Sequence, residues 1–286
     1  MAWFKNFSIK SKLTVMLLTA SLGSILVVSY LSWNKARTIL TEQIFNQLTS
    51  VRASKAYQVE FYFNSLINQI ETLCENRMVV VAMSEFNREF DQLQQEEVPP
   101  TWDQAIASYY RDEFIPRLDE NINGTPVFET YRPTELESRY LQYHYIANNP
   151  NPVGQKDELN RANDGSTYSL IHNRYHRLFQ SLIQRFGYYD LFLIDAETGH
   201  IVYSVYKETD YATSLYTGPY RNSNLADVVR QVQDNPDVGA IQLVDFQFYR
   251  PSYNAPAAFI AGPIYDGSRL VGILAAQLPI DEINRV

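Results

Sequence analysis

The chain has 286 residues, a formal net charge of −8 at pH 7 and a single cysteine, Cys74. An acidic chain does not attract nucleic acid, and no lysine and arginine cluster interleaved with aromatic residues marks one element as a nucleic-acid surface, so we expect no DNA or RNA partner. With one cysteine the fold cannot depend on internal disulfides. It must therefore be held together by core packing.

Residues 13–34 form an uncharged apolar stretch, and Lys5, Lys10 and Lys12 precede it. About 20 apolar residues at 1.5 Å each cross a hydrocarbon core of roughly 30 Å, so this stretch predicts one transmembrane helix. The preceding lysines place residues 1–12 in the cytoplasm and residues 35–286 outside it. The alternative is a cleaved signal peptide, but the stretch is longer than a usual signal core and no small-residue cleavage site follows it.

A second helical pattern follows the predicted span. Apolar residues recur in steps of 4, 4 and 3, which keeps them on one helix face with a period near 3.67. The positions are Leu40, Ile44, Leu48, Val51, Val59, Tyr62, Leu66, Ile70 and Leu73. We predict a stalk helix over residues 35–98, ended by Pro99 and Pro100, that lies on a globular domain or on a second copy of itself. A homodimer through this stalk is the expected assembly.

The rest of the chain changes from helical to strand patterns. Residues 99–186 are predicted to be mostly helical and to form the part of the domain farthest from the membrane, with a last helix that ends at Gly187. Residues 187–283 contain two strands joined by a turn at residues 196–199, then a helix, then three strands with a hairpin signal at residues 266–268. The predicted fold class is α+β, with a five-stranded antiparallel sheet and a helical insert.

This order of elements behind a span and a stalk resembles the Cache branch of the PAS-like extracytoplasmic sensor domains. The segments that carry the resemblance are residues 186–195 (FGYYDLFLID) and 256–264 (PAAFIAGPI), and residues 4–13 resemble the start of bacterial chemoreceptors, sensor kinases and membrane-bound nucleotide cyclases. The resemblance implies a bacterial inner-membrane receptor with a periplasmic sensor domain. It also implies a second span after Val286 and a cytoplasmic output module in a longer chain.

PAS-like sheets place a ligand pocket between the sheet and the inserted helix and loops. Here that region offers arginines for a carboxylate, an aspartate for an ammonium group and tyrosines for an apolar body, which suits an amino acid, a small carboxylate or an amine. The candidate ligand-binding residues are Tyr203, Tyr216, Tyr220, Arg221, Asp245, Tyr249, Arg250, Ser252 and Tyr253. The plain alternative is that the arginines are solvated, Asp245 caps a strand end and the tyrosines belong to the core.

Other chemistry was considered and set aside. No phosphate-binding loop, zinc-protease helix or nucleophile elbow occurs, so we do not expect an enzyme. His172 and His176 have the i, i+4 spacing of two metal ligands, but no third ligand is evident and a solvated helix face explains them equally well. Residues 160–171 fail as a calcium loop because Ala162 and Ile171 occupy ligand positions. No metal or cofactor is expected.

The sequence thus predicts the small-molecule-sensing region of a bacterial transmembrane receptor, which relays ligand binding across the membrane. Two alternatives stay open. The first is a signal-anchored structural or assembly protein with no output module, and the second is an exported hydrolase.

Overall fold

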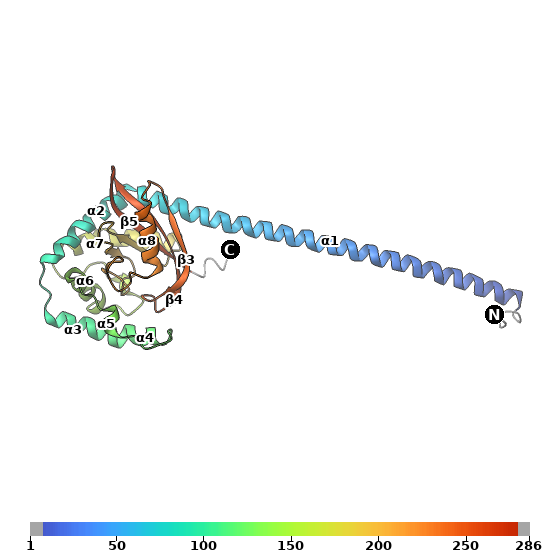
Figure 1. Ribbon diagram of the computed structural model, residues 1–286, viewed down its shortest axis with the longest axis horizontal. Coiled ribbons are helices and arrows are strands. Elements are labelled where there is room, and N and C mark those ends of the chain that lie inside the picture. Colours follow the sequence, from blue (N-terminus) through green and yellow to red (C-terminus); the bar gives the residue numbers. More distant parts are fainter. Residues whose placement is uncertain (1–7, 280–286) are drawn as a thin grey trace. The chain divides into compact units, whose positions relative to one another are not determined.

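The computed structural model describes residues 8–279 and divides the chain into two compact units, Met1–Phe61 and Tyr62–Val286 (Figure 1). The first unit is helical from Ile9 onward, as the beginning of helix α1 (Ile9–Glu75). The second unit contains the end of α1 and every other helix and strand among the described residues.

The first unit carries the apolar stretch. One 18-residue window of α1 has a mean hydropathy of 1.9 and none of it is buried, so its length and composition fit a membrane span. The row of apolar residues from Leu40 to Leu73, which we call the stripe, begins after this stretch. Its first part is also exposed, with Leu48 at 61 % and Val51 at 52 % of their full accessibility.

Helix α1 ends earlier than the sequence pattern predicts. Its last turns bury Leu66, Ile70, Leu73 and Cys74 within the second unit. Asn76 then interrupts the helix and caps α2 (Arg77–Gln92), because its side-chain oxygen accepts a hydrogen bond from Met78 N at 2.9 Å. The single helix expected over residues 35–98 is therefore two helices, followed by a short 3₁₀ turn, η2 (Leu93–Gln95).

A group of short helices fills the middle of the chain. They are α3 (Pro100–Tyr109), the π-helical turn η3 (Tyr110–Phe114), α4 (Ile115–Asp119), α5 (Phe128–Tyr131), α6 (Leu136–Gln142), the π-helical turn η4 (Tyr143–Ala147) and the 3₁₀ turn η5 (Lys156–Glu158). Helix α7 (Thr167–Phe186) follows, capped by the Ser166 side chain at its start and by Gly187 at its end, where φ is 74°.

The sheet confirms the predicted α+β class. It consists of β1 (Asp190–Ile194), β2 (Ile201–Ser204), β3 (Gln242–Tyr249), β4 (Ala255–Asp266) and β5 (Arg269–Leu278). All neighbours are antiparallel, in the order β2-β1-β5-β4-β3. The predicted insert is α8 (Asn224–Asp234), which packs against β3, β4 and β5.

The register divides the sheet into two faces. Gly262 and Gly272 lie on one face, where a side chain would collide with residues of the incoming helices: a Cβ at Gly262 would lie 3.0 Å from Cys74 Sγ, and one at Gly272 would lie 2.4 Å from Met83 Sδ. The end of α1 and α2 therefore pack on this face. Asp190 pairs with Gln277, which pairs with Phe259, so these side chains share the opposite face.

Candidate functional site

Three carboxylates gather beside the edge of the sheet formed by β1 and β2. Asp190 is the first residue of β1, and Glu208 and Asp210 lie in the loop that follows β2. Asp190 and Asp210 are fully buried, and Glu208 is partly buried. We call Asp190, Glu208 and Asp210 the acidic site.

Asp190 holds the loop that carries the other two carboxylates. Its Oδ1 accepts hydrogen bonds from the backbone N–H groups of Val205 at 2.9 Å and Tyr206 at 3.1 Å, and its Oδ2 accepts one from Ser204 Oγ at 2.9 Å. The N–H of Val205 also donates to the carbonyl of Leu191 in β1 at 3.2 Å, so pairing with β1 extends to this residue. The Asp190 carboxylate then accepts from the next N–H group, that of Tyr206, where the chain leaves β2.

Glu208 and Asp210 accept hydrogen bonds from hydroxyl groups. Glu208 accepts from Tyr189 at 2.8 Å and from Ser252 at 2.6 Å. Asp210 Oδ2 accepts from the Tyr249 hydroxyl, whereas its Oδ1 is buried without a hydrogen-bond partner among the described residues. A buried carboxylate oxygen without a donor is energetically costly, so this atom marks a position that favours a donor group.

Burial and the repulsion between neighbouring carboxylates raise the pKa values of the acidic site. Burial, with the nearby charge of Asp210, raises the pKa of Asp190 to about 7 and that of Glu208 to about 8. Burial also raises the pKa of Asp210 to about 6, although the Tyr249 hydrogen bond opposes this rise. Near neutral pH the three groups thus carry fewer than three negative charges, and a bound cation would favour their ionised form.

Lys207 of the same loop and His176 of α7 are buried next to each other. Lys207 is buried with φ at 58°, and its Nζ donates to the carbonyl of Val205 at 2.8 Å and lies 3.5 Å from His176 Nδ1. Burial lowers the pKa of Lys207 to about 7, and burial with the neighbouring lysine lowers that of His176 to about 3. His176 is therefore neutral, and Nδ1 contacts the Tyr203 hydroxyl at 2.7 Å.

The short helices hold the loop from the other side. Gln142, in α6, donates from Nε2 to the carbonyls of Thr209 and Tyr211, both at 2.9 Å, and accepts from the Tyr110 hydroxyl at 2.9 Å. These bonds satisfy the carbonyls on either side of Asp210. The position of the Asp210 carboxylate is thus held from one side by helix α6.

An open cleft of about 840 Å³ adjoins the acidic site. It lies between residues 120–123, after α4, and the loop that joins β3 to β4. Arg250, Ser252 and Tyr253 line it, and the Ser252 hydroxyl connects it to Glu208. Tyr253 has φ at 54°, and its ring lies 5.9 Å from the Phe114 ring. Asp190, Glu208 and Asp210 do not line this cleft, so it adjoins the acidic site through Ser252.

The structure divides the residues predicted to bind a ligand. Tyr249 and Ser252 contact the acidic site directly, Tyr220 bonds the adjacent Thr209 hydroxyl at 2.6 Å, and Arg250, Ser252 and Tyr253 line the cleft. Tyr203 is buried on the other side of the loop against His176, and Tyr216 bonds the carbonyl of Ala196 at 3.2 Å.

Arg221 and Asp245 take no part in the acidic site. Arg221 is exposed, and its guanidinium donates to the carbonyl of Gly218 at 3.2 Å. Asp245 is exposed on β3, where its carboxylate accepts from the N–H of Phe246. The prediction that Arg221, Asp245 and Tyr253 share one pocket is not supported by this geometry, because strand β3 directs Asp245 to solvent.

The two histidines of α7 also differ from the prediction. His172 and His176 are both fully buried, so a solvated helix face is the wrong interpretation. His172 Nδ1 contacts the carbonyl of Asn160 at 2.8 Å, and the two rings stack at 4.4 Å between centroids. They belong to the interior beside Lys207.

Comparison with known proteins gives little further information. No protein-family model matches the chain, and no curated protein matches it. Among solved structures, it is similar to the sensor domain of the histidine kinase DctB from V. cholerae, with 15 % identity, a TM-score of 0.30, and coverage of 64 % of this chain and 59 % of that chain. At this identity and TM-score the likeness does not assign a function to the chain.

Proposed function

We propose that this chain is the extracytoplasmic sensing region of a bacterial membrane receptor, and that the acidic site binds a small ligand with an amino group. The proposal depends most on one observation. Asp210 is fully buried beside two further carboxylates, and its Oδ1 has no hydrogen-bond partner among the described residues. A protonated amine supplies both the missing donor and the missing positive charge.

The aromatic surroundings support the same ligand class. Tyr249 bonds Asp210, and Tyr189, which bonds Glu208, stacks on Tyr206 at 4.7 Å between ring centroids. Tyrosine rings attract a cation through their faces, and they cover its apolar portion. Arg250, in the adjoining cleft, offers a cation to a ligand carboxylate. An amino acid or a related amine is therefore the proposed ligand, rather than a simple carboxylate.

The sheet connects the acidic site to helix α1. Gln277 of β5 lies on the same face as Asp190 and donates to Ser252 Oγ at 3.4 Å, and the neighbouring strand β4 carries Gly262 on the face where Ile70 and Cys74 pack. A ligand that displaces the Ser252 hydroxyl from Glu208 would shift these strands. We propose that the end of α1 follows that shift and transmits it toward the membrane.

A thermal-shift screen of the full chain in detergent micelles tests the ligand class. The screen pairs each amino acid or amine with the matching acid or alcohol that lacks the amino group. A ligand present at 100 times its dissociation constant adds about 2.7 kcal/mol to the stability of the folded state, which is readily measured. We expect shifts for members that have the amino group and none for their partners. Equal shifts within the pairs, or shifts for acids alone, would contradict the proposed class.

A further inference from the structure

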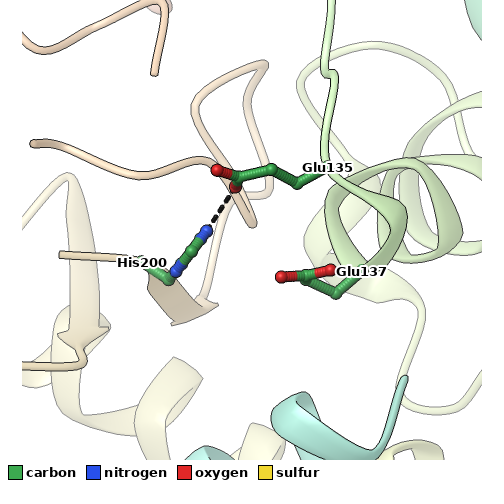
Figure 2. A group of neighbouring side chains, drawn as sticks. All are labelled: Glu135, Glu137 and His200. Atoms are coloured by element: carbon green, nitrogen blue, oxygen red, sulfur yellow. Dashed lines mark hydrogen bonds and ion pairs between the residues drawn. The ribbon is translucent and has the colours of Figure 1, made fainter. Parts of the chain in front are cut away.

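A histidine and two glutamates converge at a different place in the second unit. Glu135 precedes α6, Glu137 lies in its first turn, and His200 lies just before β2. One ligand atom of each residue lies within 4.8 Å of the others, and Figure 2 shows both carboxylates directed toward the imidazole ring. The group therefore brings together one nitrogen and two oxygen ligands from segments 65 residues apart.

The hydrogen bonds of His200 direct one ring nitrogen to the glutamates. The Thr198 hydroxyl gives its proton to Asp195 Oδ1 at 2.7 Å, so it accepts from His200 Nδ1, which lies 2.9 Å away. Nδ1 thus carries a proton, and Nε2 faces Glu135. In a metal-binding histidine, the ring nitrogen that does not bind the metal usually donates a hydrogen bond to a nearby acceptor. This bond fixes the tautomer and the orientation of the ring, as the Thr198 hydroxyl and Asp195 do here.

Glu137 provides a second, independent observation. It is only 6 % exposed, and its one hydrogen bond among residues 8–279 is a long contact of 3.4 Å from the Gln94 amide. Among the same residues it forms no ion pair with a lysine or arginine. A buried carboxylate needs a positive partner to offset its loss of hydration, and the neighbouring His200 ring already pairs with Glu135, so the two carboxylates share it.

We propose that Glu135, Glu137 and His200 bind a divalent transition-metal ion, with Zn²⁺ as the ion that fits best. Imidazole with carboxylates suits zinc, and three protein ligands leave a fourth position for water. Metal–ligand bonds of about 2.0 to 2.2 Å require the three groups to close by roughly 1 Å, which two glutamate side chains can accommodate. The ion takes the place of the proton on His200 Nε2. It would join α6, which holds the Asp210 loop through Gln142, to the turn between β1 and β2.

Calorimetric titration of Zn²⁺ into the chelator-treated full chain in detergent tests this site. We expect one ion per chain in the parent, and at least tenfold weaker binding in His200→Gln and Glu137→Gln. Thr198→Val leaves all three ligands in place but removes the support of Nδ1, and it should weaken binding about 10- to 100-fold. Controls are His144→Gln and Glu129→Gln, which change the same residue types outside the cluster and should bind as the parent does.

Circular dichroism of each chelator-treated, metal-free variant shows whether that variant is folded. Loss of Zn²⁺ binding is interpreted only for folded variants. If His200→Gln does not fold, Glu137→Gln and Thr198→Val still decide the question. Parent-like Zn²⁺ binding in these two folded variants would overturn the site, as would equal losses in the two controls. Absence of binding to the parent would overturn it outright, and tighter binding of Ca²⁺ than of Zn²⁺ would overturn the assignment of the ion.

Discussion

The carboxyl groups of Asp190, Glu208 and Asp210 are held in an environment that favours their neutral form. Their pKa values are raised to about 7, 8 and 6 respectively, mainly by burial. In the unfolded chain such groups ionise near pH 4. At these three carboxyls the folded protein therefore holds more protons than the unfolded chain between about pH 4 and pH 7. His176 acts in the opposite direction, because its pKa of about 3 in the folded protein means that it gains a proton only on unfolding below about pH 6.5.

This difference predicts an unusual pH dependence of stability. When the folded state holds more protons, the free energy of unfolding falls as pH rises, by up to about 1.4 kcal/mol per pH unit for each such group. The free energy of unfolding measured by chemical denaturation of the full chain in detergent combines this falling contribution with rising contributions from His176 below about pH 6.5 and from Lys207 above about pH 7. We therefore expect the carboxyl contribution to appear as a difference between the parent and a variant that lacks one of these carboxyls.

The variant Asp210→Asn provides the control for this prediction. The amide cannot ionise, and removal of its negative charge also relieves the repulsion that raises the pKa values of Asp190 and Glu208. The stability of the parent relative to Asp210→Asn should therefore fall between pH 5 and pH 7.5. A difference between the two proteins that does not fall over this range would show that the buried carboxyls do not retain their protons.

At the residue scale, the sequence indicated the neighbourhood of the candidate site but not its function. Tyr249, Ser252 and Tyr253 follow a strand into a loop beside the sheet, where Ser252 and Tyr253 line the cleft and Tyr249 bonds Asp210. Ligand binding by these residues stays a prediction. Arg221 and Asp245 were chosen for their charge, which does not reveal whether a side chain faces the interior. Glu208 and Asp210 were missed, although a charged run at residues 207–210 within a tyrosine-rich segment was a signal that could have indicated them.

At the element scale, α6 and the loop after β2 are joined by Gln142. Substitution of Gln142 by leucine removes the donor of the buried Tyr211 carbonyl and leaves the Thr209 carbonyl with only a 3.3 Å hydrogen bond from the Tyr110 hydroxyl. We expect Gln142→Leu to lower the free energy of unfolding by about 2 to 4 kcal/mol, since each lost partner of a buried polar group costs about 1 to 3 kcal/mol. Denaturant titration measures this change. Gln231→Leu on the exposed face of α8 is the matched control and should be close to neutral.

The stripe on α1 changes its role along the helix. Leu66, Ile70 and Leu73 pack into the second unit, whereas Leu40, Ile44 and Leu48 are exposed. We propose that the exposed part is the seam of a homodimer. Leu48→Asp should then weaken self-association of the full chain in detergent, as measured by sedimentation velocity, because it places a charge in an apolar contact.

Asn46→Asp is the matched control, since it places the same charge on the opposite side of the helix. It should leave the association of the parent unchanged. A parent that remains monomeric at high concentration would refute the seam, and so would equal effects of the two substitutions.

The strands were more predictable than the helices. Turn signals at Gly199 and Gly267, both with positive φ, bounded the strands and fixed their number. The break of the long helix at Asn76 was missed because the apolar pattern continues through Val79 and Val80, and only capping by Asn76 separates the two helices. The buried face of α7 could not be derived from residue polarity, because Leu170 and Leu178 are exposed whereas His172 and His176, for which a solvated face was considered, lie inside.

At the scale of the whole molecule, the account requires the acidic site to lie outside the cytoplasm. We expect a reporter that is active only outside the cytoplasm to be active when fused after Gln95, because the lysines before residue 13 favour a cytoplasmic N-terminus. A reporter active only in the cytoplasm should be inactive at the same position. The reverse result would place the second unit in the cytoplasm and remove the extracytoplasmic sensor from consideration.

The central claim is that the acidic site binds an amine-bearing ligand through Asp210. Calorimetry with the strongest amino-group ligand from the thermal screen tests it most directly, on the full chain and on the variants Asp210→Asn and Asp245→Asn. Removal of the charged partner of a desolvated ligand costs about 2 to 5 kcal/mol, so we predict that Asp210→Asn weakens binding about 30-fold or more. Asp245→Asn, an identical change at an exposed position, should bind as the parent does. Full affinity in a folded Asp210→Asn protein would contradict the account.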